Sequence, residues 1–91
     1  MRYRSRTDII VSMLQAARLG ETKTRIMYSS LLSSHQLRTY LELVISNGLL
    51  AYDSTKGQYR TTARGLRLLD LYDNVDRLEL PRVGKDTTTQ K

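Results

Sequence analysis

The stretch between residues 33 and 48 constrains the fold more than any other part of the chain. Ser33 and Gln36 have the spacing of a capping box, in which two side chains satisfy backbone N–H groups at a helix start. A single apolar stripe at helical spacing follows, formed by Leu37, Tyr40, Leu41, Val44 and Ile45. Asn47 and Gly48 are typical of a helix end. These signals predict an amphipathic helix whose polar face no core requires.

The residues after this helix favour a β-hairpin. Residues 49–53 and 58–61 are short segments rich in apolar and β-favouring residues, and the turn between them ends in Gly57, which suits a strained position. Tyr52 and Tyr59 can pair across the two strands, so we expect most tyrosines to pack in the domain rather than to stack on bases. Thr62 is placed to cap a last helix that begins at Ala63.

Two further helices are expected before residue 33. Ser5 and Asp8 form another capping box, so a first helix should run from about Arg6 to Leu19 and stop at Gly20. Its apolar residues recur at three- and four-residue steps and are Ile9, Ile10, Met13, Leu14 and Ala17.

A second, shorter helix should follow Gly20. Thr22 can cap it, and Ile26 and Met27 should point inward. In the turn after this helix we expect both leucines, Leu31 and Leu32, to enter the core.

The charge of the chain points to a polyanionic partner. It carries 15 Lys+Arg against 9 Asp+Glu, a formal net charge of +6 at pH 7, and such a surface attracts polyanions. Residues 1–60 hold nine Lys or Arg and four Asp or Glu, whereas residues 61–91 hold six and five. Nucleic acid is therefore the first candidate, and the part before the last helix is expected to face it.

Composition and motifs exclude several classes of function. With 91 residues the chain has the size of one small domain. It has no cysteine, and His35 is its only histidine, so neither a disulfide framework nor a thiolate or histidine metal site is expected. Without a glycine-rich phosphate loop, a nucleophile motif or a paired-carboxylate site, we expect no catalysis and no cofactor. No apolar stretch approaches the roughly 20 residues that span a bilayer. We expect a cytoplasmic, nucleoid-associated protein with no membrane partner and no evident small-molecule ligand.

The predicted order of three helices, a two-stranded hairpin and a final helix is that of a winged helix-turn-helix. Short motifs over about residues 6–72 strengthen this interpretation. They are Lys23-Thr24-Arg25-Ile26-Met27-Tyr28, then Leu37 with Tyr40-Leu41, then Asn47-Gly48-Leu49-Leu50 with Tyr52-Asp53, then Tyr59 followed by Thr62 and Gly65. In these motifs the chain resembles the archaeal winged-helix family that includes the ten-kilodalton DNA-binding proteins.

The resemblance implies a mainly α fold with a small β-hairpin, DNA binding, and a dimer formed through a long C-terminal helix. The chain departs from the family at this helix. Pro81 comes 18 residues after Ala63, so only a short coiled coil is expected.

This organisation divides the chain into four parts. Residues 1–5 are a basic N-terminal arm, residues 6–62 the winged helix-turn-helix domain, residues 63–80 the C-terminal helix, and residues 81–91 a disordered tail with too few apolar residues to pack. The arm contains Arg2 and Arg4 and resembles arms that enter minor grooves, or it is a terminus without contacts.

Ten residues are expected to contact DNA, at the start of the second helix, in the first turns of the third helix and on the hairpin. They are Lys23, Thr24, Arg25, Ser34, His35, Gln36, Arg38, Thr39, Lys56 and Arg60. In this motif the first turns of the third helix reach base edges, so Arg38 is expected to read guanine or to bind phosphate. Glu42 would be repelled by phosphate, which indicates that only the first two turns approach the duplex.

Each of these residues also has a structural alternative. Gln36 can simply complete its capping box, and the threonines near Lys23 can serve as N-caps. The charges on the hairpin can serve solubility alone, and His35 and Arg38 can be ordinary helix-surface residues.

The last helix is expected to have two apolar faces. Leu66 and Leu69 should point to their own domain. On another side a 3-4-3 spacing is typical of a coiled-coil seam and predicts a homodimer interface made by Leu68, Leu71, Val75 and Leu78. The alternative is a helix packed between parts of one domain.

We therefore expect a dimeric winged-helix protein that binds double-stranded DNA, as a transcriptional regulator or a chromatin-type protein. One alternative is a protein–protein interaction module with the same fold and no DNA binding. Another is an RNA-binding protein.

Overall fold

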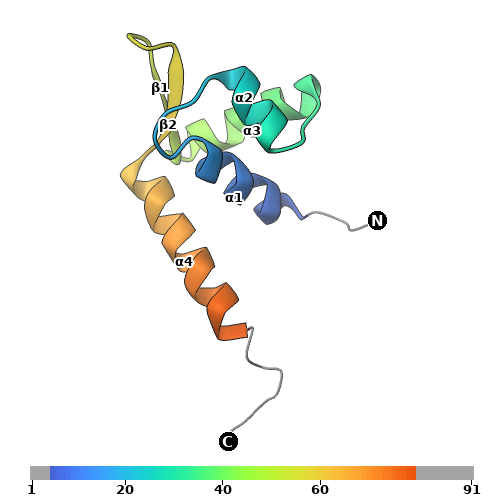
Figure 1. Cartoon of the computed structure of the whole chain (residues 1–91), viewed down its shortest axis with the longest axis vertical. Coiled ribbons are helices and arrows are strands. Elements are labelled where there is room, and N and C mark those ends of the chain that lie inside the picture. Colours follow the sequence, from blue (N-terminus) through green and yellow to red (C-terminus); the bar gives the residue numbers. More distant parts are fainter. Residues whose placement is uncertain (1–4, 80–91) are drawn as a thin grey trace, which may run out of the picture.

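The computed structural model describes residues 5–79, except for the side chains of residues 75–79. In chain order it contains α1 (Arg6–Ala16), α2 (Lys23–Ser29), α3 (Ser34–Ser46), β1 (Leu50–Asp53), β2 (Gln58–Thr61) and α4 (Ala63–Glu79). The predicted order of elements is confirmed. Figure 1 shows the hairpin projecting at one end of the molecule and α4 leaving at the other. The expected N-terminal arm lies outside the described residues apart from Ser5, and so does the expected tail.

Both predicted capping boxes are present. The Ser5 hydroxyl accepts from the Asp8 amide at 3.1 Å, and an Asp8 carboxylate oxygen accepts from the Ser5 amide at 3.2 Å. At the start of α3, the Ser33 hydroxyl accepts from the Gln36 amide at 3.1 Å, and Gln36 Oε1 accepts from the Ser33 amide at 3.0 Å. These bonds satisfy donors that a helix start otherwise leaves unpaired, and they fix where α1 and α3 begin.

The first helix is shorter than the sequence predicts. It ends at Ala16 rather than near Leu19. The carbonyl of Ala17 accepts from the amides of Gly20 at 3.1 Å and Thr61 at 3.0 Å, so the chain leaves the helix to bond with the hairpin. Gly20 takes a φ of +99°, in agreement with its predicted role as a stop.

The hairpin is confirmed, and an isolated β-bridge joins its second strand to the loop between α1 and α2. Tyr52 lies opposite Tyr59, with ring centroids 4.9 Å apart. Gly57 has the positive φ expected of the turn. Glu21 and Tyr59 exchange two backbone hydrogen bonds of 2.9 and 2.8 Å, which ties the loop between α1 and α2 to β2.

One core lies between α1, α2, α3 and the base of the hairpin. It contains Ile9, Met13, Leu14, Ala17, Ile26, Leu32, Leu37, Leu41, Val44 and Leu50, all buried. The Thr61 hydroxyl, itself buried, donates to the Leu14 carbonyl at 2.7 Å, so the hairpin is joined to α1 inside the core.

The prediction that both leucines of the α2–α3 turn enter the core is wrong for Leu31. Its side chain is 79% exposed and its φ is +57°, whereas Leu32 is buried. The amide of Leu32 donates to the Met27 carbonyl at 3.0 Å, and that of Leu31 donates to the Tyr28 carbonyl at 3.2 Å. This is a Schellman motif, and its left-handed residue, here Leu31, turns its side chain away from the core.

The predicted faces of α4 also need correction. Leu68 and Leu69 pack against the core, whereas Leu66, expected to face inward, is 41% exposed. Gly65 determines this rotation, because a Cβ there would collide with the Leu49 carbonyl oxygen and the Thr61 side chain. The absence of a side chain lets α4 lie directly on the hairpin base, which turns Leu68 inward. Of the predicted seam, Leu71 is exposed, and the side chains of Val75 and Leu78 lie outside the description.

Candidate nucleic-acid interface

The outer face of α3 is polar, as predicted. Leu37, Leu41 and Val44 are buried against the core on the opposite side. The side chains exposed on the outer face are Ser34, His35, Gln36, Arg38, Thr39, Glu42 and Ser46. The buried part of α3 is narrower than the apolar stripe in the sequence. At the edges of the stripe Tyr40 is half-buried and Ile45 is 41% exposed.

Four of the predicted contact residues meet in one groove between α2 and α3. Lys23 and Thr24 come from the start of α2, and Ser34 and Arg38 come from the first half of α3. The groove has a volume of about 680 Å³, and Tyr59 of β2 closes it toward the hairpin. Thr22 holds the α2 side in place, because its hydroxyl accepts from the Arg25 amide at 3.3 Å.

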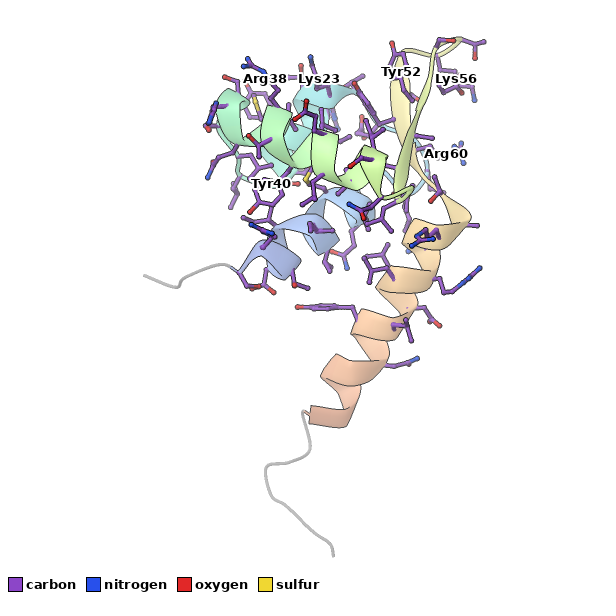
Figure 2. The ribbon with its side chains drawn as sticks, turned by 180° about the vertical axis from the view of Figure 1, so that it is seen from behind. Lys23, Arg38, Tyr40, Tyr52, Lys56 and Arg60 are labelled. Atoms are coloured by element: carbon purple, nitrogen blue, oxygen red, sulfur yellow. The ribbon has the colours of Figure 1, made fainter. Side chains whose placement is uncertain are left out.

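The hairpin separates its two predicted cations. Lys56 lies in the turn at the tip and is exposed. Figure 2 shows Lys23, Arg38 and Lys56 along one edge of the molecule, whereas Arg60 lies toward the base of the hairpin. The Arg60 guanidinium donates to the Leu19 carbonyl at 3.3 Å, which directs it to the loop between α1 and α2. We call Lys23, Arg38 and Lys56 the basic edge.

Lys23 and Arg38 of the basic edge have no acidic partner among the described residues, whereas Lys56 interacts electrostatically with Asp53. None of the three forms an ion pair with a residue that the structure describes. Arg25 differs, because its Nε lies 3.5 Å from a Glu21 carboxylate oxygen. A cation without a partner can approach a phosphate without first breaking an ion pair, so Arg25 is less available than Lys23, two residues before it.

The remaining predicted residues of α3 are partly engaged in the helix itself. Gln36 does complete its capping box through its carbonyl oxygen, and its amide N–H groups remain able to donate. The Thr39 hydroxyl donates to the His35 carbonyl at 3.2 Å. The His35 side chain is exposed. Of these residues His35 and Gln36 therefore offer polar groups to a ligand more readily than Thr39.

Asp53, the last residue of β1, has a role in the hairpin turn that the sequence interpretation did not assign. Asp53 Oδ1 accepts from the Thr55 hydroxyl at 2.6 Å and from the Thr55 amide at 3.0 Å. The hydrogen bond from the Thr55 side chain is the main cause of a lowered pKa of Asp53, and Lys56 adds a smaller contribution. The Asp-Ser-Thr order of residues 53–55 is typical of such a turn and could have revealed it.

Two searches of the described part of the chain gave negative results. Among its residues, no group of three or more His, Cys, Asp or Glu side chains could hold a metal ion. No helix within it is long and apolar enough to cross a membrane.

Comparison with known proteins identifies the family of the chain. A family model described as winged helix-turn-helix matches residues 3–80, which includes every described element. No curated protein matches the chain. A winged helix-turn-helix domain indicates DNA binding in general.

Proposed function

This chain belongs to the winged helix-turn-helix family, and we propose that it binds double-stranded DNA with α3 and the hairpin. In such domains a helix enters the major groove and reads base edges, while other parts contact the backbone. The observation that carries the proposal is the basic edge: Lys23 of α2, Arg38 of α3 and Lys56 of the hairpin turn share one edge and form no ion pair with a described residue. Cations placed in this way can each neutralise a phosphate.

The contacts divide into two kinds. Lys23, Thr24 and Lys56 are suited to the DNA backbone, because they lie at a helix start and at a hairpin tip beside the major-groove helix. Arg38 lies on the outer face of α3, where its guanidinium can donate to guanine O6 and N7. Arg60 is assigned to the hairpin base instead, on the strength of its bond to Leu19.

The proposed assembly is a homodimer through α4. Leu71 is 57% exposed, and an exposed leucine beside other apolar residues favours a partner. It lies in a groove between α1, the end of α3 and α4, whose floor is largely apolar and whose lining also includes Asn47 and three arginines. The apolar residues are Ile10, Leu43, Leu49, Leu68 and Leu71, and the arginines are Arg6, Arg64 and Arg67. A two-fold dimer through this flank would hold two α3 helices in a fixed relation, so that each could address its own half-site.

The proposed role is that of a transcriptional regulator or a chromatin-type protein in the cytoplasm, at the nucleoid, without catalysis. The resemblance to the archaeal ten-kilodalton proteins supports either role. The same apolar groove supports a second candidate, a winged-helix module that binds another protein and not DNA. The two candidates differ in their response to salt, because only polyanion binding releases many counterions.

A salt series on duplex DNA tests the proposal. We expect binding to a random-sequence duplex to weaken steeply as salt rises, with a slope of about 0.9 per phosphate contacted. The double variant Lys23→Ala/Lys56→Ala should lower that slope by about 1.8 per protomer, whereas the control Arg60→Ala should lower it little. The proposal fails if the protein does not bind duplex DNA at low salt, or if binding does not depend on salt.

A further inference from the structure

Glu42 lies on the outer face of α3, between two grooves. It lines the groove that contains Lys23 and Arg38 on one side of the helix, and it lines a second groove with Arg6 and Thr39 on the other side. Glu42 shares this position with Ser46, which also borders both grooves, so the two residues lie between the grooves on the outer side of α3. The Glu42 side chain is exposed. If α3 enters the major groove, Glu42 enters with it.

The Glu42 carboxylate has no partner among the described residues. It forms no ion pair with Arg38, although residues four apart on a helix are neighbours. The flanking hydroxyls do not bind it either: the Thr39 hydroxyl donates to the His35 carbonyl, and the Ser46 hydroxyl donates to the Leu43 carbonyl, each at 3.2 Å. The carboxylate is therefore available to a ligand.

A carboxylate in this place opposes one kind of DNA contact and favours another. It repels phosphates, so it weakens binding that rests on the backbone alone. In the major groove, however, cytosine presents its N4 amino group as a donor, and glutamate is a suitable acceptor for it. The repulsion by phosphate, which from the sequence alone indicated that this turn stays away from DNA, is equally consistent with a turn that faces bases.

We infer that Glu42 is a specificity-determining residue that accepts a hydrogen bond from the N4 amino group of a cytosine in the major groove. The inference rests on the proposed function and makes it more specific: DNA binding is sequence-selective rather than uniform. Arg38, one helical turn before Glu42, donates to a guanine, whereas Glu42 accepts from a cytosine. The four-residue separation is a rise of about 6 Å along α3, so the two residues address different base pairs.

Selection from a pool of duplexes with randomised sequence tests this inference. The unmodified protein should enrich one cytosine position, and replacing that base pair should weaken binding about 5- to 150-fold. Glu42→Ala should abolish the preference at this position and strengthen binding to a random-sequence duplex. Glu42→Gln should change the preferred base from cytosine to adenine, because a carboxamide pairs with adenine N6 and N7.

Two controls separate base reading from a structural effect. Ser46→Ala removes a hydroxyl already used within α3, one turn after Glu42, and should leave the selected sequence unchanged. Because Glu42 is exposed, its variants should keep the circular dichroism spectrum of the parent protein.

The inference is overturned if the unmodified protein binds duplexes but enriches no cytosine, or if Glu42→Ala changes binding to selected and random duplexes by the same factor. Absence of duplex binding by every form of the protein, the unmodified one included, would instead overturn the proposed function and this inference with it.

Discussion

The helices α3 and α4 rest on the same core but present different outer surfaces. On α3 the buried residues form one stripe, and the outer face is polar. On α4 the apolar residues surround much of the helix, so that Leu68 and Leu69 pack inward while Leu66 and Leu71 remain exposed. An amphipathic helix with a single stripe can pack in one rotation only, whereas a helix with several apolar flanks needs another contact to fix its rotation. We therefore assign the polar ligand to α3 and the apolar partner to α4.

The largest effect should come from charging the exposed flank of α4. Leu71→Glu should dissociate the proposed dimer, because burying two carboxylates at one interface is costly. Loss of the second binding unit should weaken duplex binding at least about 100-fold, although Leu71 does not itself contact DNA. Sedimentation and duplex titration measure the two effects.

Leu66→Glu is the matched control, since Leu66 is also partly exposed but lies on the other flank of α4. It should leave both mass and affinity unchanged. An unmodified protein that sediments at 10.5 kDa, the mass of one chain, at micromolar concentration would contradict the assignment of α4 to a partner.

The next largest effect concerns how α4 is held in its rotation. Gly65→Ala would place a Cβ against the Leu49 carbonyl and 2.6 Å from Thr61 Cγ2, so the helix must move away from the hairpin. We expect a loss of about 1–3 kcal/mol of unfolding free energy, measured by urea denaturation. Asp70→Ala, at an exposed position on the flank of α4 that carries Leu66, should change it by no more than about 0.5 kcal/mol. Equal stability of the Gly65 variant and the parent would mean that another contact sets the rotation.

The difference between α3 and α4 also explains how much the sequence could predict. The capping box at Ser33 and the stripe led by Leu37 determine the bounds and the buried side of α3, and both are visible in the sequence. For α4 the deciding contact is between Gly65 and the backbone of Leu49, sixteen residues earlier. A contact between backbones leaves no periodic pattern, so the sequence could not show that Leu68, and not Leu66, packs against the core.

A smaller effect concerns the residues that end α2 and α3. The end of α3 has the same pair of hydrogen bonds as the end of α2. The Leu49 amide donates to the Val44 carbonyl at 2.9 Å, and the Gly48 amide donates to the Ile45 carbonyl at 3.0 Å, so Gly48 occupies the place that Leu31 has after α2. Both Gly48 and Leu31 have positive φ, at +72° and +57°. Leucine is strained there and glycine is not.

Leu31→Gly should therefore stabilise the protein by about 0.5–1 kcal/mol, since its exposed side chain loses little packing. Gly48→Ala should destabilise it by about 1 kcal/mol through strain alone, because its Cβ would meet Arg64 Cδ at an ordinary 3.6 Å. Thermal unfolding of both variants measures these shifts. Destabilisation by Leu31→Gly would show that Leu31 makes a contact worth more than its strain.

The predicted contact residues also differ in how far the sequence could place them. The sequence places Lys23 and Arg38 on the starts of two helices, and the structure brings them into one groove. The separation of Arg60 from Lys56 could not be foreseen, because it depends on the loop carbonyl of Leu19, whose position follows from the early end of α1.

The smallest effect lies in the hairpin turn. The Thr55 hydroxyl lowers the pKa of Asp53, so Thr55→Val should return this pKa toward its ordinary value. A lowered pKa in the folded state means that the bond stabilises the fold above the unfolded pKa, and that this contribution is lost as pH falls through the folded pKa. The variant should therefore lose less stability on acidification. A carboxyl titration followed by NMR measures the shift, and an unchanged pKa would remove Thr55 as its cause.

The most direct test of the comparison between α3 and α4 is to map the DNA contact on the amide NMR spectrum during titration with a duplex at low salt. The account predicts the largest shifts at the start of α2, on α3 around Arg38 and Glu42, and at the hairpin tip around Lys56, with small shifts along the exposed flank of α4. Large shifts on α4 together with an unchanged α3 would contradict it.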